Sequence, residues 1–564
     1  MTAVDAARAT RRRVLTLLYG ERAEEVDDEV QRRIDATTAP RPVSCWDERA
    51  AWMISYPNQF RSSDESPLRT LRRALTEHLQ PEITGVHVLP FHPWSSDGGF
   101  SVTSFADVDP AHGTWEDIAE LAATTDLMAD AVINHASAQG DWFRGFLAGD
   151  PAFGGFFREV DADADLTDVV RPRSTPIPAE FTRDDGTPVT VWTTFSRDQI
   201  DLDYRNPAVL LAATDVVLSY VAAGARAIRL DAVAFVWKQE GTSSIHLPET
   251  HAIVQFLRAC LDEVDPHIAL ITETNVPHGE NISYFGPPGV REAQAVYQFP
   301  LPPLTLHSFL SGSAVALRDW ARSLTFDRDD TTFLNFLASH DGVGLRPVEG
   351  LLGAADRQRL EDTCARAGGV VNRRRLPDGT EAGYELTGTW FSMLAADHSD
   401  EEALERHVAS HAIPLALRGL PLLYVHSLTA SSNDRDAYLA SGQGRDLNRA
   451  TFDIDQIGRA LTDPSARASR TWSRLRTLLR SRASSPAFHP DAEQLLLDAP
   501  DELFVVQRTG RGGGEALVVV NVSGRQVSYD LPGGTWEQID GGQVVGPSID
   551  LPRWHHAWLR RADR

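Results

Sequence analysis

ARAIRLDAVAF, residues 225–235, is a short apolar run that gives way to a carboxylate, Asp231. Two further segments share this pattern: IALITETN (268–275, with Glu273) and FLNFLASHD (333–341, with Asp341). A buried strand fixes its own backbone, while the side chain at its C-terminal tip projects into the loop layer. The three segments therefore predict rigidly held carboxylates at one end of a parallel sheet.

Short apolar runs of this kind recur along the middle of the chain and alternate with amphipathic stretches. That alternation is typical of parallel strands joined by crossover helices. We expect strands at 51–57, 83–90, 126–134, 225–233, 267–275, 294–299, 332–340 and 420–427. Eight such units close into a barrel. The predicted fold class is therefore α/β, with a (β/α)8 TIM barrel formed by residues 50–135 and 201–487.

The remaining segments differ from the barrel in their pattern of apolar and polar residues. Residues 1–49 are expected to form an N-terminal helical segment. Residues 136–200, rich in Gly, Asp and Pro, are expected to be an inserted lid domain after the third strand, and 342–395 an insert after the seventh. Both segments follow strands and therefore lie at the C-terminal face of the barrel, where the active sites of such barrels are found. Residues 488–564 alternate short apolar runs with Gly-rich turns, which predicts a C-terminal antiparallel β domain.

Composition narrows the classes of partner. The chain has 564 residues, and Asp and Glu outnumber Lys and Arg by 79 to 54, for a net charge of -25. This charge opposes binding to phosphate backbones, so nucleic acid is not expected as a partner. No stretch resembles a signal peptide or a membrane span. The three cysteines, Cys45, Cys260 and Cys364, suit a reducing compartment. We expect a cytoplasmic monomer or homodimer that acts on small molecules.

Three strand-end carboxylates suit the cleavage of a glycosidic bond with retention. One carboxylate acts as nucleophile and a second as acid and then base, about 5 Å apart. A third can stabilise the positive charge that develops on the sugar. A single aspartate after a strand is more often a turn former or a helix cap. Three in order, with Arg229 two residues before Asp231, make that explanation a poor one.

Four ordered segments resemble the signature regions of the alpha-amylase superfamily. They are DAVINH (130–135), AIRLDAV (227–233), ITETN (271–275) and SHDG (339–342). Within that superfamily, LPFHPWSSDGGFSV (89–102) and GTSSIHLPETH (241–251) are similar to the sucrose phosphorylase subfamily. SHDGVGLRPVEGLL, YELTGTWF and QGRDLNR resemble its glucosylglycerate phosphorylase branch.

The resemblance implies a role for each carboxylate. Asp231 would be the nucleophile, Glu273 the general acid and base, and Asp341 the transition-state stabiliser. Arg229 shares a strand face with Asp231 and can hold its carboxylate ionised. Glu273 must instead keep a proton, which a partly desolvated site with neighbouring carboxylates favours.

The resemblance also implies residues that bind the glucosyl ring. We expect hydroxyl contacts from His135 and His340, a clamp on the remote hydroxyls from Asp97 and Arg445, and stacking faces from Phe100 and Phe156. The superfamily often binds calcium near the residue that is Asn134 here, but the phosphorylase subfamily usually does without it. We expect neither a metal nor a cofactor.

The predicted reaction is phosphorolysis of an α-glucoside to α-glucose 1-phosphate. Arg144 and Arg346 follow strands at the catalytic face and suit an anionic acceptor, because arginine binds carboxylate and phosphate in a bidentate way. Glycerate is our first choice, ahead of fructose 6-phosphate and of neutral fructose, the acceptors of sucrose 6-phosphate and sucrose phosphorylases. An α-glucoside hydrolase or transglucosidase remains an alternative, since the same carboxylates serve water. A non-catalytic barrel used for binding is the other alternative.

Overall fold

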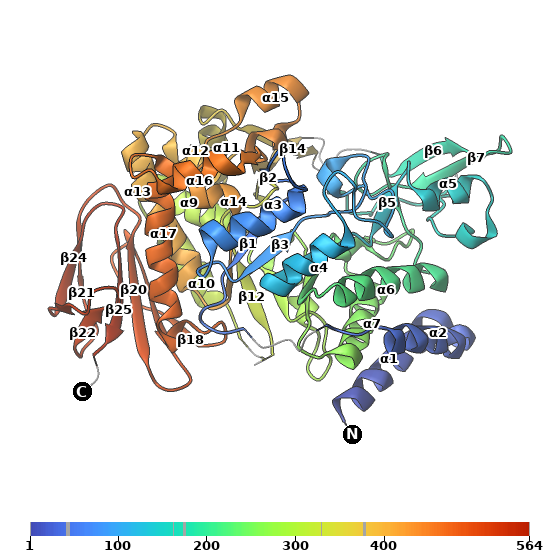
Figure 1. Ribbon diagram of the computed structural model, residues 1–564, viewed down its shortest axis with the longest axis horizontal. Coiled ribbons are helices and arrows are strands. Elements are labelled where there is room, and N and C mark those ends of the chain that lie inside the picture. The colour runs from blue at the N-terminus through green and yellow to red at the C-terminus, as the bar shows by residue number, and fades with distance from the viewer. Residues whose placement is uncertain are drawn as a thin grey trace.

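Eight parallel strands close into a barrel at the centre of the molecule (Figure 1). The computed structural model describes residues 2–40, 46–161, 163–172, 176–326, 328, 330–375 and 380–562, so Cys45 lies outside the described residues. The barrel strands are β1 Trp52–Ser55, β3 Gly85–Val88, β4 Asp126–Ala131, β9 Ala227–Leu230, β10 Ala269–Thr272, β11 Ala295–Tyr297, β12 Thr332–Asn335 and β16 Leu420–Tyr424. They lie in the order β1-β16-β12-β11-β10-β9-β4-β3, which confirms the predicted (β/α)8 barrel.

The strands are shorter than the apolar runs that predicted them, although each lies within its expected range. The run after β12 shows why: Phe336, Leu337 and Ala338 continue past the last ladder residue and line a cavity at the C-terminal end of the barrel. The register sets which side chains meet inside. Asp130 on β4 pairs with Arg229 on β9, and Arg229 pairs with Ile271 on β10.

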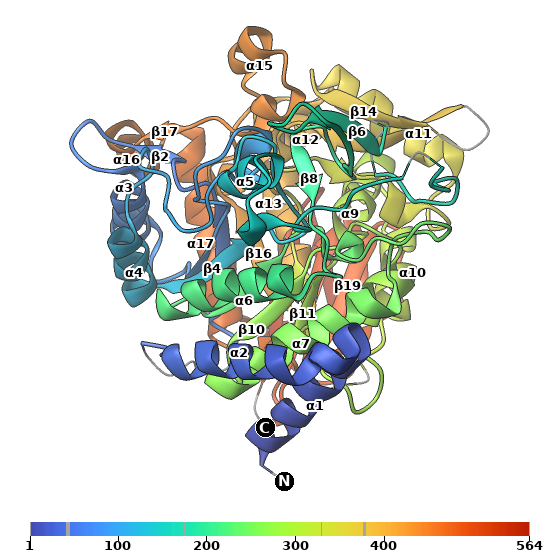
Figure 2. The same ribbon diagram turned by 90° about the vertical axis from the view of Figure 1, so that its right-hand side faces the viewer.

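Helices cover the outside of the barrel (Figure 2). They include α3 Pro67–Ala74, α4 Trp115–Thr124, α6 Pro207–Ala222, α7 Pro248–Val264, α9 Leu301–Ser311, α10 Val315–Ser323, α13 Asp400–Ala416 and α17 Arg467–Ala483. Local sequence starts them. Asn206 caps α6 by accepting a hydrogen bond from the Ala208 N–H at 3.0 Å, and Pro207 occupies the first helical position.

Shorter elements connect the barrel units. They are β2 Phe60–Arg61, α8 His278–Ile282, α12 Trp390–Ala395, α14 Val425–Thr429, α15 Arg435–Ser441, β17 Phe452–Asp453 and α16 Ile454–Thr462. Strands β2 and β17 pair in parallel outside the barrel. Within the described residues, no helix is both long and apolar enough to cross a membrane.

Two helices at the N-terminus, α1 Ala3–Tyr19 and α2 Ala23–Ala36, lie against α7 (Figure 2). A fully buried arginine joins them to the barrel. Arg11 Nε lies 2.6 Å from Oδ1 of Asp27 on α2, and the guanidinium also pairs with Glu263 on α7. Removing one partner of such a buried pair would leave an uncompensated charge.

Two insertions lie over the C-terminal end of the barrel. The first contains β5 His135–Ser137, α5 Asp141–Leu147, β6 Pro178–Thr182, β7 Pro188–Trp192 and β8 Gln199–Asp201. Its antiparallel pair of β5 and β8 brings His135 opposite Asp201. The second contains β13 Val343–Gly344, α11 Ala354–Arg366, β14 Val370–Arg375 and β15 Glu381–Thr387, with the strands ordered β13-β15-β14. Both insertions contribute residues to the cavity described below.

The C-terminal part is an antiparallel β structure, as predicted, on the left in Figure 1. Its strands are β18 Glu493–Leu496, β19 Leu503–Thr509, β20 Glu515–Asn521, β21 Val527–Asp530, β22 Trp536–Gln538, β23 Val544–Val545, β24 Ser548–Leu551 and β25 His556–Arg561. Six of them form one sheet in the order β18-β19-β20-β25-β22-β23, and β21 pairs with β24. Alternation along β19 and β20 gives each face its own apolar cluster.

Candidate active site

All three predicted carboxylates line one cavity, whose empty space is about 1140 Å³ including the part open to solvent. Asp231 and Glu273 come directly after β9 and β10. Their backbones still follow the ladder, because the Asp231 N–H donates to the Ala131 carbonyl at 3.1 Å and the Glu273 N–H donates to the Leu230 carbonyl at 3.0 Å. The strands therefore fix both side chains, whereas Asp341 is carried by the loop after β12.

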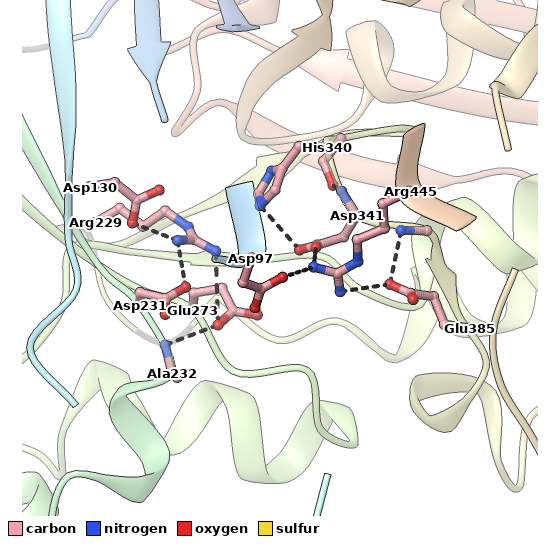
Figure 3. A network of polar contacts seen from close by, with 12 residues as sticks. Asp97, Asp130, Arg229, Asp231, Ala232, Glu273, His340, Asp341, Glu385 and Arg445 are labelled. Atoms are coloured by element: carbon pink, nitrogen blue, oxygen red, sulfur yellow. Dashed lines mark hydrogen bonds and ion pairs between the residues drawn. The ribbon is translucent and has the colours of Figure 1, made fainter. Parts of the chain in front are cut away.

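The guanidinium of Arg229 lies between Asp130 on one side and Asp231 and Glu273 on the other (Figure 3). Its Nη1 is 2.6 Å from Oδ1 of Asp130 and 2.9 Å from Oδ1 of Asp231, and its Nη2 is 3.8 Å from Oε2 of Glu273. The guanidinium is buried, as is Asp130. One fixed cation thus contacts three carboxylates, of which Asp231 and Glu273 line the cavity.

Burial raises the pKa of both Asp231 and Glu273, and their mutual repulsion adds to the rise for Asp231. Arg229 opposes the rise at both residues, but its short hydrogen bond is to Asp231. The hydrogen bond from Arg229 stabilises the ionised form of Asp231, whereas Nη2 of the same guanidinium lies 3.8 Å from Oε2 of Glu273. The Ala232 N–H donates to Oε2 of Glu273 at 3.1 Å and fixes the orientation of that carboxyl.

Asp341 has the opposite electrostatic balance. Burial alone would raise its pKa, but Arg445 and, with it, Arg449 outweigh burial and lower the pKa. Arg445 Nη1 lies 2.9 Å from Oδ1 of Asp341 and 3.3 Å from Oδ1 of Asp97, and its Nη2 lies 3.4 Å from Oε1 of Glu385 (Figure 3). Asp341 is therefore ionised at neutral pH.

Two neutral histidines complete the wall of the cavity. His340 stacks on Phe100 with ring centroids 5.0 Å apart, and burial lowers its pKa to about 3. Burial also lowers the pKa of His135, whose Nε2 donates to the Phe100 carbonyl at 2.8 Å. Each ring is thus a neutral hydrogen-bonding group at neutral pH.

Three of the predicted residues do not line this cavity. Arg229 lines a smaller pocket, which Glu273 and Asp341 also line. Phe156 is buried in the first insertion, where its ring contacts Trp142 and Phe153 edge-on, rather than lining the cavity. Arg144 is an exposed residue of α5 and does not line the cavity either. Sequence reasoning placed both by their loop, but the side chains on one loop point in different directions. Arg346, by contrast, lines the cavity with the carboxylates.

The cavity is also lined by residues that were not singled out from the sequence, and four of them bear on the argument. Phe195 is the aromatic residue of the first insertion that reaches the cavity, and it meets Phe235 edge-on at 5.6 Å. Gln199 donates to Oδ2 of Asp97 at 3.2 Å. Glu385 and Asn275 are the other two. Glu385 belongs to the quoted segment YELTGTWF, and Asn275 belongs to ITETN. The motifs therefore marked both segments, but they did not show that these two side chains point into the cavity.

The surroundings of Asn134 are occupied by a lysine. Lys238 Nζ donates to Oδ1 of Asn134 at 2.8 Å and lies 2.9 Å from Oδ1 of Asp201. Its ammonium thus supplies positive charge to these buried oxygens. Within the described residues, no cluster of three or more His, Cys, Asp or Glu side chains has the arrangement of a metal site.

Comparisons with known proteins identify the family. The alpha amylase catalytic domain matches residues 55–346. A glucosylglycerate phosphorylase of Allomeiothermus silvanus is 44% identical over 532 residues, which cover 93% of this chain and 95% of the relative. A glucosylglycerate phosphorylase of Escherichia coli is 41% identical over 520 residues, 91% of this chain and 92% of the relative.

A solved structure extends the likeness to the fold. The crystal structure of sucrose 6F-phosphate phosphorylase from Thermoanaerobacter thermosaccharolyticum has a TM-score of 0.73 and covers 84% of this chain and 94% of that chain, at 23% identity. The family model and the two relatives confirm the family inferred from the sequence motifs. The chain belongs to the alpha-amylase family, and its similarity within that family lies with the glucosylglycerate phosphorylases.

Proposed function

We propose that the protein is a glucosylglycerate phosphorylase, which converts an α-glucoside of glycerate and inorganic phosphate into α-glucose 1-phosphate and glycerate. The relatives at 41% and 44% identity, which span nearly the whole chain, support the reaction class. The observation that carries the choice of acceptor is the position of Arg346, which lines the same cavity as Asp231, Glu273 and Asp341.

In the first step the glycosidic bond breaks. The ionised carboxylate of Asp231, held by Arg229 at 2.9 Å, attacks the anomeric carbon and forms a β-glucosyl ester. Glu273 gives its proton to the departing oxygen, so the acceptor leaves with a neutral hydroxyl. Burial keeps the pKa of Glu273 raised and hence keeps that proton available.

In the second step phosphate takes the place of the acceptor. Its oxygen attacks the same carbon from the face the acceptor left, which breaks the ester and restores the α configuration. Glu273, now a carboxylate, accepts the phosphate proton. Asp341, kept ionised by Arg445 at 2.9 Å, stabilises the positive charge on the sugar in both steps.

The glucosyl ring is proposed to lie between the carboxylates and the aromatic wall. Phe100 offers a flat apolar face, and the neutral His340 can hydrogen-bond to hydroxyls. His135 can do so when its Nε2–H exchanges the Phe100 carbonyl for a hydroxyl. Asp97 and Arg445 form the clamp on the remote hydroxyls of the ring, and Oδ1 of Asp97 lies 3.3 Å from Nη1 of Arg445. A sugar hydroxyl that bridges them would satisfy both groups.

One panel of reactions tests the proposal. Glucosylglycerate, sucrose 6-phosphate, sucrose and glucosylglycerol are each incubated with and without phosphate, and α-glucose 1-phosphate is measured. We expect phosphate-dependent product, with the highest rate for glucosylglycerate. Preference for sucrose 6-phosphate or sucrose would reassign the acceptor. Equal glucose release without phosphate would make the protein a hydrolase, and no turnover at all would favour the non-catalytic barrel.

The proposal includes a cytoplasmic location and a monomer or homodimer. The thiols of Cys260 and Cys364 are buried and unpaired, which suits a reducing compartment. We also propose the domain boundaries given above, in which the two insertions close over the sugar.

A further inference from the structure

We propose that Asn275 is a specificity-determining residue, which recognises the primary hydroxyl of glycerate at carbon 3. This inference rests on the proposed function and deepens it. The acceptor then makes three contacts: its carbon-2 oxygen with Glu273, its carboxylate with Arg346, and its hydroxymethyl group with Asn275.

The first support is the position of Asn275 beside the proton donor. It comes two residues after Glu273 and lines the same cavity. Its Oδ1 is buried and, within the described part of the chain, has no hydrogen-bond partner. A buried amide oxygen without a partner is costly, by about 1 to 3 kcal/mol. A hydroxyl donor on the acceptor would remove that cost when the amide turns Oδ1 toward the cavity.

The second support is the close approach of Gly344. A Cβ atom at this position would fall 2.9 Å from Nδ2 and 3.0 Å from Oδ1 of Asn275. A Cβ atom there would require the amide of Asn275 to shift. The pairing of Gly344 with Glu385 on β15 fixes this backbone, so the amide is held in place from one side.

The third support is the neighbouring cation. Arg346 comes two residues after Gly344 and lines the cavity. Within the described residues its ion pair is loose, with Nη2 3.9 Å from Oε2 of Glu280. The guanidinium can therefore take a carboxylate in a bidentate way. Asn275 and Arg346 thus present a hydrogen-bond acceptor and a cation on adjacent parts of the wall.

This arrangement separates glycerate from lactate, which has the same carboxylate and carbon-2 hydroxyl but a methyl group at carbon 3. Lactate would leave Oδ1 of Asn275 unpaired against that methyl group. A site built to hydrogen-bond a hydroxyl rejects the analogue without it, because its polar group is left unsatisfied. We expect kcat/KM with glycerate to exceed that with lactate by about tenfold to a hundredfold.

The test measures glucosyl transfer from α-glucose 1-phosphate to D-glycerate, L-glycerate, D-lactate and L-lactate. Comparisons are made within one configuration, in wild type, Asn275→Ala and Asn275→Leu. We expect the ratio of glycerate to lactate to fall to about one in Asn275→Ala, and to one or below in Asn275→Leu, which keeps the γ-branched shape of the side chain but has no polar atom. General losses of folding or catalysis cancel in this ratio.

Arg346→Ala is the matched comparison, because both acids carry the carboxylate. It should lower kcat/KM for glycerate and lactate alike and leave their ratio unchanged. A wild-type ratio near one, or a ratio that survives in both Asn275 variants, would overturn the role of Asn275 while the phosphorylase proposal stands. A wild type that transfers glucose to neither acid would overturn the proposed function itself, and the role of Asn275 with it.

Discussion

Arg445 Nη1 lies 2.9 Å from Oδ1 of Asp341, although the two residues come from different parts of the chain. Arg445 is in the segment 444–448, beyond the last barrel strand, whereas Asp341 follows β12. The same guanidinium approaches Asp97 and Glu385. One cation therefore offsets part of the negative charge of carboxylates drawn from three segments, and the proposed sugar site forms only when these segments are brought together.

Removing this cation should change the pH dependence of catalysis. In Arg445→Ala the pKa of Asp341 rises, because burial is then opposed only by weaker neighbours. Asp341 must be ionised to act, so the acid limb of kcat/KM should move to higher pH, with a loss of about tenfold to a hundredfold at neutral pH. Arg435→Ala, an exposed arginine of α15, is the control. An unshifted acid limb in Arg445→Ala would contradict this account.

The role of Asp231 predicts a complete loss of the covalent intermediate. Asp231→Ala removes the nucleophile, so turnover should fall by about 10⁴-fold or more while the protein stays folded. Mass spectrometry after addition of α-glucosyl fluoride should detect no glucosyl-enzyme in this variant. Substantial phosphorolysis by Asp231→Ala would assign the nucleophile to another residue.

The role of Glu273 predicts a dependence on the leaving group. Glu273→Gln keeps the shape of the side chain but has no proton to give. Glucosylglycerate, whose alkoxide is a poor leaving group, should lose about 10²-fold to 10⁴-fold in kcat/KM, whereas 4-nitrophenyl α-glucoside should lose much less. The two substrates are compared on the same variant. Equal losses would argue against proton donation by Glu273.

The position of Arg346 predicts a loss confined to anionic acceptors. Arg346→Ala removes one charge-assisted contact and should cost about 1.5 to 3 kcal/mol on glucosylglycerate, a tenfold to hundredfold fall in kcat/KM. Glucosylglycerol carries no charge and should be little affected. Arg144→Ala is the matched control, because Arg144 is exposed on α5 outside the cavity. An even loss on both substrates would remove Arg346 from acceptor binding.

The barrel could be predicted from the sequence because each strand is a local signal. Apolar runs reveal β9 and β10, and a carboxylate at the end of such a run must face the catalytic end of the barrel. Asp231 and Glu273 were therefore placed by physics as well as by resemblance. Asp341 was placed by its motif, since it lies six residues beyond the end of β12.

The insertions could not be read in the same way, because no strand period sets where their side chains point. Phe195 reaches the cavity and Phe156 does not, although both are aromatic residues of one insertion. Glu385 was missed for a related reason. It reaches Arg445 only through the pairing of β13 with β15, a contact between segments that sequence alone does not fix.

Buried neutral histidines set the response of stability to pH. Burial lowers the pKa of His340 to about 3 and the pKa of His92, His411 and His426 to about 4. Unfolded, these rings titrate near the ordinary pKa of about 6.5. Below that pH the unfolded chain therefore binds more protons than the folded one, and folding stability falls as the pH decreases.

Urea unfolding at pH 7.5, 6.5, 5.5 and 4.5 measures this effect. Stability should change little above about pH 6.5 and then fall towards pH 4, by at most about 1.4 kcal/mol per histidine for each pH unit. Asp231 and Glu273 act in the opposite sense, because their pKa values are raised, but they are fewer than the histidines. His411→Gln removes one titrating ring and should lessen the slope. A free energy of unfolding that rises steadily from pH 6.5 to 4.5 would show that these rings are already protonated in the folded protein.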